Sequence, residues 1–249
     1  MEPVQPVCLC IDLGNTLGKL GVFHQGRLLH QWSGKALESC VEAVLDQFHP
    51  SRSILSSVIA HDPALESLLA SRTEFILLDH QTRVPFSNAY EGGSTLGPDR
   101  IALAAAAVSH YPGHHCLVVA AGTCIVLNLV SREGVFLGGS IAPGLQMRMR
   151  ALHDFTEKLP LEVPAPLFPL VGYNTRQSIL SGCLGGAVAE TEGLIGKYRS
   201  RYEGLKVLLT GGDSPFFNRL LETETSLVPD LLLRGLLAIL DFNPSSPPT

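Results

Sequence analysis

Residues 8–29 read CLCIDLGNTLGKLGVFHQGRLL, and residues 116–137 read CLVVAAGTCIVLNLVSREGVFL. The two stretches align without a gap at an offset of 108, and the identical pairs include Cys8 with Cys116, Gly14 with Gly122, and Gly26 with Gly134. Each stretch consists of an apolar run, a glycine-containing turn, a second run, another glycine turn and a third run. This pattern predicts three successive strands joined by tight turns, present twice in the chain.

The segments that follow the two stretches also alternate between helix and strand in a similar order. After the first stretch, the residue pattern predicts a helix at 37–48, a strand at 53–59, a helix at 63–71 and a strand at 74–78. After the second, we expect helices at 145–155 and 176–198, a strand at 206–209, a helix from Pro215 and a last helix at 229–240. The shared order favours duplication over chance similarity. It predicts an α/β fold with two ribonuclease-H-like domains, each a mixed five-stranded sheet flanked by helices.

The repeat also indicates how the chain divides. We expect an N-terminal domain at 1–112, a C-terminal domain at 113–242 and a disordered Pro- and Ser-rich tail at 243–249. Two such domains facing each other would bring both first turns into one central cleft, which is a place to bind a nucleotide.

Composition excludes several classes of protein. Of the 249 residues, 45% are hydrophobic and 16% are charged, as in a folded globular chain. The net charge of −5 comes without any Lys/Arg run, which argues against nucleic acid as a partner. Because no apolar stretch is long enough to span a bilayer and no secretory leader is visible, we expect no membrane association. The six scattered cysteines fit buried thiols in a reducing cytoplasm.

The first turn, Asp12-Leu13-Gly14-Asn15-Thr16, has the residue types of a phosphate-binding loop. Gly14 would let the backbone approach a ligand, and the donors of Asn15 and Thr16 can hold phosphate oxygens. A carboxylate beside them, Asp12, can hold Mg²⁺ through water. Lys19, in the next strand, is either a phosphate contact or a solvated edge residue. Taken alone, the five residues of the turn also fit an ordinary hairpin.

Two further glycine elements extend the candidate site. Gly122-Thr123 occupies the repeat position and is a second candidate phosphate loop. Gly211-Gly212 follows the strand KVLLT and is suited to packing flat against an adenine or ribose, although such a pair also fits a plain turn. The stretch at 139–144 is either another edge of the cleft or a turn between strand and helix.

Gly97-Pro98-Asp99-Arg100 precedes the Ala-rich run IALAAAAV. Pro98 suits the first position of a helix and Asp99 its first turn, so helix initiation explains the segment structurally. The functional alternative makes Asp99 a base that accepts a hydroxyl proton and Arg100 a group that binds an anionic substrate.

Together these motifs resemble the type III pantothenate kinases, a family of the actin-like, sugar kinase superfamily. The family's markers are DxGNT, GxDR, a GTxxTxD-like segment and a GGxIxPG turn, which this sequence matches in order at 12–16, 97–100, 122–128 and 138–144. The similarity continues through Asn88-Ala-Tyr90, the segment at 150–160, Asn174-Thr175 and Thr210-Gly211-Gly212, so it covers nearly the whole chain.

The resemblance implies ATP-dependent phosphorylation of pantothenate to 4'-phosphopantothenate, the first step of coenzyme A biosynthesis, with Asp99 as the catalytic base. It implies a pantothenate site formed by Tyr90, Gly97, Pro98, Asp99, Arg100 and Thr175. The ATP site would comprise Asp12, Gly14, Asn15, Thr16, Lys19, Gly122, Thr123, Gly211 and Gly212. It further implies a homodimer that needs Mg²⁺ and a monovalent cation, K⁺ or NH₄⁺. The candidate metal ligands in this sequence are Asp12 and, through its side-chain carbonyl oxygen, Asn128, and we expect the protein in the cytoplasm.

The second loop departs from the family pattern, which normally reads Asp-x-Gly-Thr-Ala-x-Thr-x-Asp. Ala120, Val126 and Asn128 stand where that pattern has Asp, Thr and Asp. Fewer hard oxygen ligands should lower the affinity for cations, and fewer negative neighbours should lower the proton affinity of Asp99. Two hypotheses follow: a working pantothenate kinase with an altered cation site, or a catalytically impaired relative that acts as a ligand-binding or regulatory protein. A kinase for another hydroxylated metabolite is a third alternative.

Overall fold

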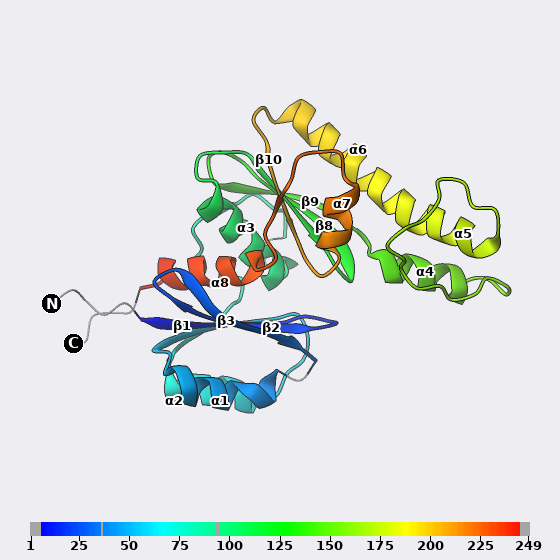
Figure 1. The fold of residues 1–249 in the computed structure, drawn as a ribbon. Helices are drawn as coiled ribbons and strands as arrows, with labels where there is room; N and C mark the ends of the chain where they lie inside the picture. The colour runs from blue at the N-terminus through cyan, green and yellow to red at the C-terminus, as the bar shows by residue number, and fades with distance from the viewer. Residues whose placement is uncertain (1–5, 36, 93–94, 245–249) are drawn as a thin grey trace. The chain divides into compact units, whose positions relative to one another are not determined.

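The structure is a computed structural model that describes residues 6–35, 37–92 and 95–244 (Figure 1). Contacts divide the chain into two compact units. The first comprises Met1–Pro112, Gly134–Phe136 and Asp230–Thr249, and the second comprises Gly113–Glu133 and Leu137–Pro229. Within the described ranges, none of the helices has the length and apolar character needed to cross a membrane.

The first unit is built on a five-stranded sheet. Its strands are β1 (Val7–Leu13), β2 (Gly18–His24), β3 (Arg27–Gly34), β4 (Arg52–Ser57) and β5 (Glu74–Leu77). They lie in the order β3-β2-β1-β4-β5, with β1 antiparallel to β2 and parallel to β4. Apolar side chains of α1 (Glu38–Phe48) and α2 (Pro63–Arg72) pack with those of β1 and β2 in one core cluster, and Figure 1 shows both helices on one face of the sheet.

Two helices complete the first unit, α3 (Pro98–His110) and α8 (Leu231–Phe242). They pack so closely that a Cβ on Gly235 would lie 1.8 Å from the carbonyl oxygen of Ala102. Arg52 of β4 holds the end of α8 by donating to the carbonyl oxygens of Leu240, at 2.6 Å, and Asn243. The sequence places this closing helix in the domain at 113–242, whereas its contacts group it with the first unit. Chain order does not reveal which sheet a terminal helix covers.

The second unit repeats the strand order of the first. Its elements are β7 (Cys116–Ala121), β8 (Cys124–Val130), β9 (Val135–Pro143), α4 (Leu145–Asp154), α5 (Thr175–Leu180), a π-helix (Ser181–Gly185), α6 (Gly186–Arg201), β10 (Lys206–Thr210), α7 (Ser214–Leu220) and β11 (Ser226–Leu227). The order β11-β10-β7-β8-β9 mirrors β5-β4-β1-β2-β3, which confirms the predicted duplicated α/β fold.

Two features depart from the expected pattern. The helix predicted at 176–198 is divided by the π-helix into α5 and α6. The second sheet also gains a sixth strand, because β6 (Ser87–Asn88) pairs in parallel with Val135 and Phe136 at the start of β9. A two-residue strand leaves no periodic signal in a sequence, so its existence depends on tertiary pairing alone.

The two copies share one turn and differ in the other. Gly26 and Gly134 occupy equivalent turns with φ angles of 72° and 73°, a left-handed conformation that favours glycine. In the preceding hairpins, however, Asp12 pairs with Lys19 while Ala120 pairs with Val126. At the offset of 108, Ala120 would pair with Leu127, so the register of the second hairpin is shifted by one residue.

The tail predicted to be disordered begins at Asn243, which the structure describes. Its side-chain amide donates to the carbonyl oxygens of Arg83 and Ile239, both at 2.8 Å. Residues 245–249 of that tail lie outside the described residues.

Candidate active site

The first turn presents a buried carboxylate at the end of β1. Asp12 is only 6% exposed and accepts a hydrogen bond of 3.0 Å from the hydroxyl of Ser56, its register partner on β4. The pKa of Asp12 is raised to about 6: burial is the main cause and the charge of Asp99 adds to it, against the lowering effects of the Ser56 hydrogen bond and of Lys19. Lys19 lies opposite Asp12 on β2, and burial lowers the pKa of its ammonium. Ionising a buried carboxylate is unfavourable because it has lost its contact with water. A cation beside Asp12 would offset that loss, so this carboxylate is suited to binding one.

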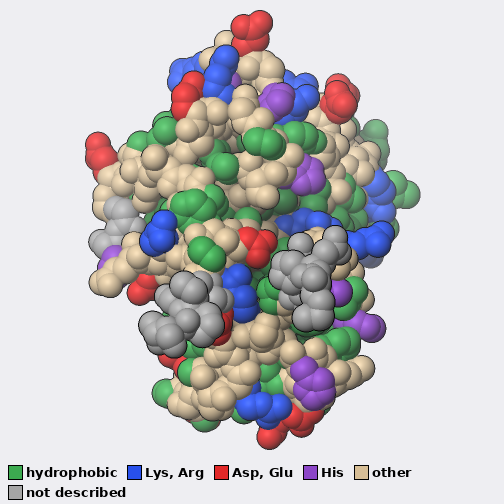
Figure 2. Space-filling model, turned by 90° about the vertical axis from the view of Figure 1, so that its left-hand side faces the viewer, with side chains coloured by type: hydrophobic (Ala, Val, Ile, Leu, Met, Phe, Trp, Pro, Cys, Tyr) green, Lys and Arg blue, Asp and Glu red, His purple; other side chains and the backbone are tan. Residues whose placement is uncertain are grey.

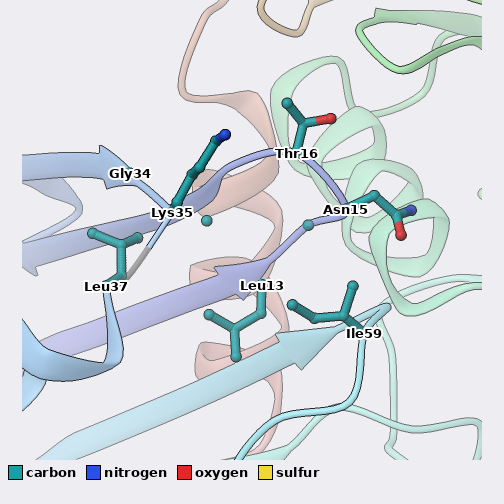
Figure 3. A pocket seen from close by; sticks show the side chains of 9 residues that line it. Leu13, Asn15, Thr16, Gly34, Lys35, Leu37 and Ile59 are labelled. Atoms are coloured by element: carbon teal, nitrogen blue, oxygen red, sulfur yellow. The ribbon is translucent and has the colours of Figure 1, made fainter. Parts of the chain in front are cut away.

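The turn that follows Asp12 borders a cavity of about 420 Å³ (Figure 3). Gly14 is required for the tight turn, because a Cβ there would lie 2.9 Å from the carbonyl oxygen of Leu17. Asn15 and Thr16 are exposed, and both line the cavity. Lys35, at the end of β3, lines it too and extends in the same direction as Thr16 in Figure 3. Lys35 belongs to no sequence motif, and it is the pairing of β2 with β3 that brings it near the turn.

Asp99 lies in the first turn of α3, and the glycine before it makes room for its carboxylate. A Cβ on Gly97 would lie 2.6 Å from an Asp99 carboxylate oxygen. Burial raises the pKa of Asp99, while its own helix-start amides and Arg100 lower it. Because the charge of Asp99 acts on Asp12, the first unit brings these two carboxylates into one electrostatic neighbourhood. Pro98 begins α3, so the structural role predicted for this motif and the candidate catalytic role coexist.

The predicted substrate residues Tyr90 and Arg100 also meet in the first unit. The guanidinium carbon of Arg100 lies 5.2 Å from the centre of the Tyr90 ring, and the arginine is 7% exposed. Thr175, by contrast, belongs to the second unit, where it is an exposed residue at the start of α5. Asn174 caps that helix by accepting a 2.9 Å hydrogen bond from the Gln177 amide.

The second loop, Gly122-Thr123, is shaped by close-packed glycines. A Cβ on Gly144 would lie 2.0 Å from the carbonyl oxygen of Gly122, and the Gly144 amide donates to the Thr123 carbonyl at 3.0 Å. A Cβ on Gly211, which has a φ of 98°, would lie 2.1 Å from the carbonyl oxygen of Ala121. Gly212 differs from its neighbour, since a Cβ there would meet open space. The loop is therefore fixed by backbone contacts that only glycine permits.

The positions that depart from the family pattern lie in the strands beside this loop. Ala120 is half-buried in β7, between Val126 of β8 and Thr210 of β10 in register. Asn128 is fully buried in β8, opposite Val118. Among the described residues, no group of three or more His, Cys, Asp or Glu side chains could hold a metal ion. Asp12 is a single buried carboxylate at the turn, and proteins commonly bind Mg²⁺ through one or two carboxylates together with substrate phosphates and water.

The family model described as type III pantothenate kinase matches residues 8–197. A protein of that name from Christiangramia forsetii is 43% identical over 238 residues, with 94% of this chain and 98% of the relative covered. Another from Cytophaga hutchinsonii is 38% identical over 235 residues, with 94% and 99% covered.

Two solved structures share the fold at low sequence identity. A conserved protein from Campylobacter jejuni, assigned to the Baf family of transcriptional activators, has a TM-score of 0.60 at 20% identity, with 94% of this chain and 98% of that chain covered. A glucokinase from an Antarctic psychrotroph has a TM-score of 0.50 at 12% identity, with 96% and 99% covered. At these identities the likeness shows the fold alone.

Proposed function

The chain belongs to the type III pantothenate kinase family, and from this premise we propose that it transfers the γ-phosphoryl group of ATP to the primary hydroxyl of pantothenate. The product is 4'-phosphopantothenate, the first intermediate on the way to coenzyme A. The observation that carries the proposal is the pair of carboxylates Asp12 and Asp99, both largely buried with raised pKa values, within the first unit.

Asp99 is the residue that receives the hydroxyl proton. The pantothenate oxygen attacks the γ-phosphorus, the bond to the bridging oxygen of ADP breaks, and the proton passes to Asp99. Burial raises the pKa of this carboxyl and so increases its proton affinity, which offsets the loss of acidic neighbours at Ala120 and Asn128. Positioning and charge neutralisation supply most of the acceleration in phosphoryl transfer, so a modest base is sufficient.

Both turns of the repeat bind nucleotide phosphates, by different means. The first uses the backbone at Gly14, the side chains of Asn15 and Thr16, and the ammonium of Lys19. The second uses the backbone of Gly122 and Thr123, which the glycine contacts hold in a fixed conformation. Gly211 and Gly212 bind the nucleoside part, and the positive φ of Gly211 keeps this turn flat against Ala121.

Mg²⁺ accompanies ATP and is bound by Asp12, with the side-chain oxygen of Asn128 as a second candidate ligand. A buried carboxylate of raised pKa fits this role, because a cation beside it would offset the cost of keeping it ionised. Mg²⁺ neutralises the charge of the phosphates when it is bound. A monovalent cation, K⁺ or NH₄⁺, binds only weakly in this protein, since Ala120 supplies no ligand atom to the second loop.

Pantothenate is bound in the first unit by Tyr90, by Gly97, Pro98 and Asp99 at the start of α3, and by Arg100, which binds its carboxylate. Thr175 of the second unit also takes part. Support for this assignment comes from the burial of Arg100, since a desolvated guanidinium interacts more strongly with an anion than an exposed one does.

A homodimer is part of the same proposal. The segment between α4 and α5 carries large apolar side chains that are almost fully exposed in the single chain: Phe155 at 87%, Leu167 at 82%, Leu170 at 92% and Tyr173 at 85%. Apolar surface of this kind is typical of an interface. We expect the parent to run as a dimer in light scattering, and a monomeric Leu170→Glu variant would assign the interface to this segment.

The remaining proposals concern the partners of the protein and its location in the cell. On the face shown in Figure 2, Lys and Arg side chains occur together with Asp, Glu and His side chains. All six cysteines are free thiols, as is usual for proteins of the reducing cytoplasm. ATP and pantothenate are therefore the proposed partners besides a second copy of the chain, in the cytoplasm.

The proposal is tested by incubating the purified parent with pantothenate, ATP, Mg²⁺ and K⁺ and measuring phosphopantothenate by mass spectrometry. Formation of product in proportion to ADP is the expected result. Calorimetric binding of both ligands without product would instead establish a ligand-binding or regulatory protein. Turnover of a different hydroxylated metabolite in preference to pantothenate would assign another kinase activity.

A further inference from the structure

The guanidinium of Arg100 lies against two aromatic rings that come from different parts of the chain. Its guanidinium carbon lies 5.2 Å from the centre of the Tyr90 ring and 5.4 Å from that of Phe136. The two rings are themselves in contact, with centroids 6.0 Å apart. Phe136 is completely buried, and neither its sequence context nor any motif singled it out.

The pairing of β6 with β9 is what brings these rings together. The Ser87 amide donates to the Gly134 carbonyl at 2.9 Å, and the Ala89 amide donates to the Phe136 carbonyl at 3.0 Å. The side chain of Asn88 then accepts from the Tyr90 amide at 2.9 Å, which fixes the chain just beyond the strand. The two-residue strand β6 therefore sets Tyr90 against Phe136.

From this geometry we infer that Phe136 is a positioning residue for substrate binding: its ring, with that of Tyr90, holds the Arg100 guanidinium in the orientation that binds the carboxylate of pantothenate. The inference rests on the proposed function, because it takes the anionic end of pantothenate as the ligand of Arg100. Phe136 does not touch the substrate. It acts by fixing the arginine, since a desolvated cation over a ring face is attracted to it and loses rotational freedom.

This role makes a specific kinetic prediction. Phe136→Leu keeps an apolar side chain but removes the ring face, so KM for pantothenate should rise about five- to thirtyfold. KM for ATP and kcat should stay within about threefold, because the role proposed for this ring is to hold the arginine that binds the carboxylate and not to act on the phosphates or the hydroxyl. The uncharged alcohol analogue of pantothenate, which lacks the carboxylate, should show almost no change in KM.

Phe86 provides a matched control, because its ring contacts Phe136 at a centroid distance of 6.3 Å without lying against Arg100. Phe86→Leu should leave KM for pantothenate within about twofold. In an Arg100→Ala background, Phe136→Leu should add nothing to KM, since the residue it positions is absent. An equal rise for Phe86→Leu, or an additive effect with Arg100→Ala, would reduce Phe136 to a packing residue and overturn the inference.

A second pair of variants tests the ring face if Phe136→Leu does not fold. Phe136→Met also removes the ring face but is flexible enough to fill the space, and it should raise KM for pantothenate as Phe136→Leu does. Phe136→Tyr keeps the ring and should give a smaller rise, and an equal rise in both variants contradicts the inference. If the parent binds pantothenate without turnover, the proposed activity fails, and the same comparisons are made on Kd. A parent that neither binds nor phosphorylates pantothenate overturns both proposals.

Discussion

The turn at 12–16 and its repeat partner at 120–124 share one strand–turn–strand pattern but obtain their polar character differently. In the first, the buried carboxylate of Asp12 accepts from Ser56 and faces Lys19 across the strands. In the second, Ala120 occupies the position of that carboxylate and pairs with Val126. Duplication has therefore preserved the strand–turn–strand pattern and concentrated the charge in one copy.

Close glycine contacts explain why the backbone persisted in the second copy. Gly144 and Gly211 approach the loop so closely that any side chain at either position would collide with its carbonyl groups. A carboxylate in the strand before the loop contributes charge but does not shape the turn, so replacing it with alanine leaves the backbone intact. The comparison predicts that the first turn depends on the charge of Asp12. The second turn should depend on the absence of side chains at Gly144 and Gly211.

The largest expected effect is on catalysis, through the first turn. Asp12→Ala gives the first copy the residue that the second already has, and kcat/KM for MgATP should fall at least about a hundredfold. Steady-state kinetics across a range of Mg²⁺ concentrations checks this. A loss below about threefold would show that the charge difference between the two turns has no functional meaning.

The next effect is on stability and depends on pH. Because the folded-state pKa of Asp12 is raised from 3.8 to about 6, the folded state keeps a proton that the unfolded state releases, and stability falls as pH rises through that window. Without divalent cations, Asp12→Asn should gain about 3 kcal/mol over the parent above pH 6.

Chemical unfolding of parent and variant at several pH values measures this difference, which should vanish below the ordinary pKa of 3.8. Glu157→Gln, at an exposed residue, is the control for removing one carboxylate and should change the free energy of unfolding little. A gain for Asp12→Asn that is independent of pH would contradict the raised pKa.

The glycine pair after β10 offers an internal control for the second loop. Gly211→Ala should lower the free energy of unfolding by about 1–3 kcal/mol, because its Cβ would meet the Ala121 carbonyl oxygen and its φ is positive. Gly212→Ala meets open space and should change stability by less than about 0.5 kcal/mol. Thermal and chemical unfolding measure both, and equal effects would remove the distinction.

The smallest expected effect concerns restoring the missing carboxylate. Ala120→Asp places a half-buried charge opposite Val126, without the lysine that Asp12 has, so it should destabilise the protein by about 1–2 kcal/mol in the absence of cations. KCl should recover this loss, while choline chloride at the same ionic strength should not. Equal recovery by both salts would show screening rather than a restored cation site.

The internal repeat was enough to predict the duplicated fold, because tight turns and apolar strands recur at a fixed offset. It could not predict that α8 covers the first unit, since that depends on the fit of Gly235 against α3. The register shift at Val126 was also invisible, because strand pairing changes there without any gap in the sequence alignment.

Motif residues of the candidate site could be chosen from sequence, whereas the residues that support them could not. Asp12 and Asp99 lie in recognisable segments, and the structure brings both into the first unit. Ser56, Lys35 and Phe136 have no motif, and each reaches the site through strand pairing. The register in which the strands pair in the folded protein cannot be read from a single sequence.

In the proposed reaction, the first unit provides the catalytic carboxylate for phosphoryl transfer to pantothenate. This role is tested most directly by kcat for phosphopantothenate formation in the parent and in Asp99→Asn, with calorimetry confirming that both bind pantothenate. We expect kcat to fall about 10²- to 10⁴-fold while pantothenate remains bound. An Asp99→Asn variant that turns over at the parent's rate would contradict the account.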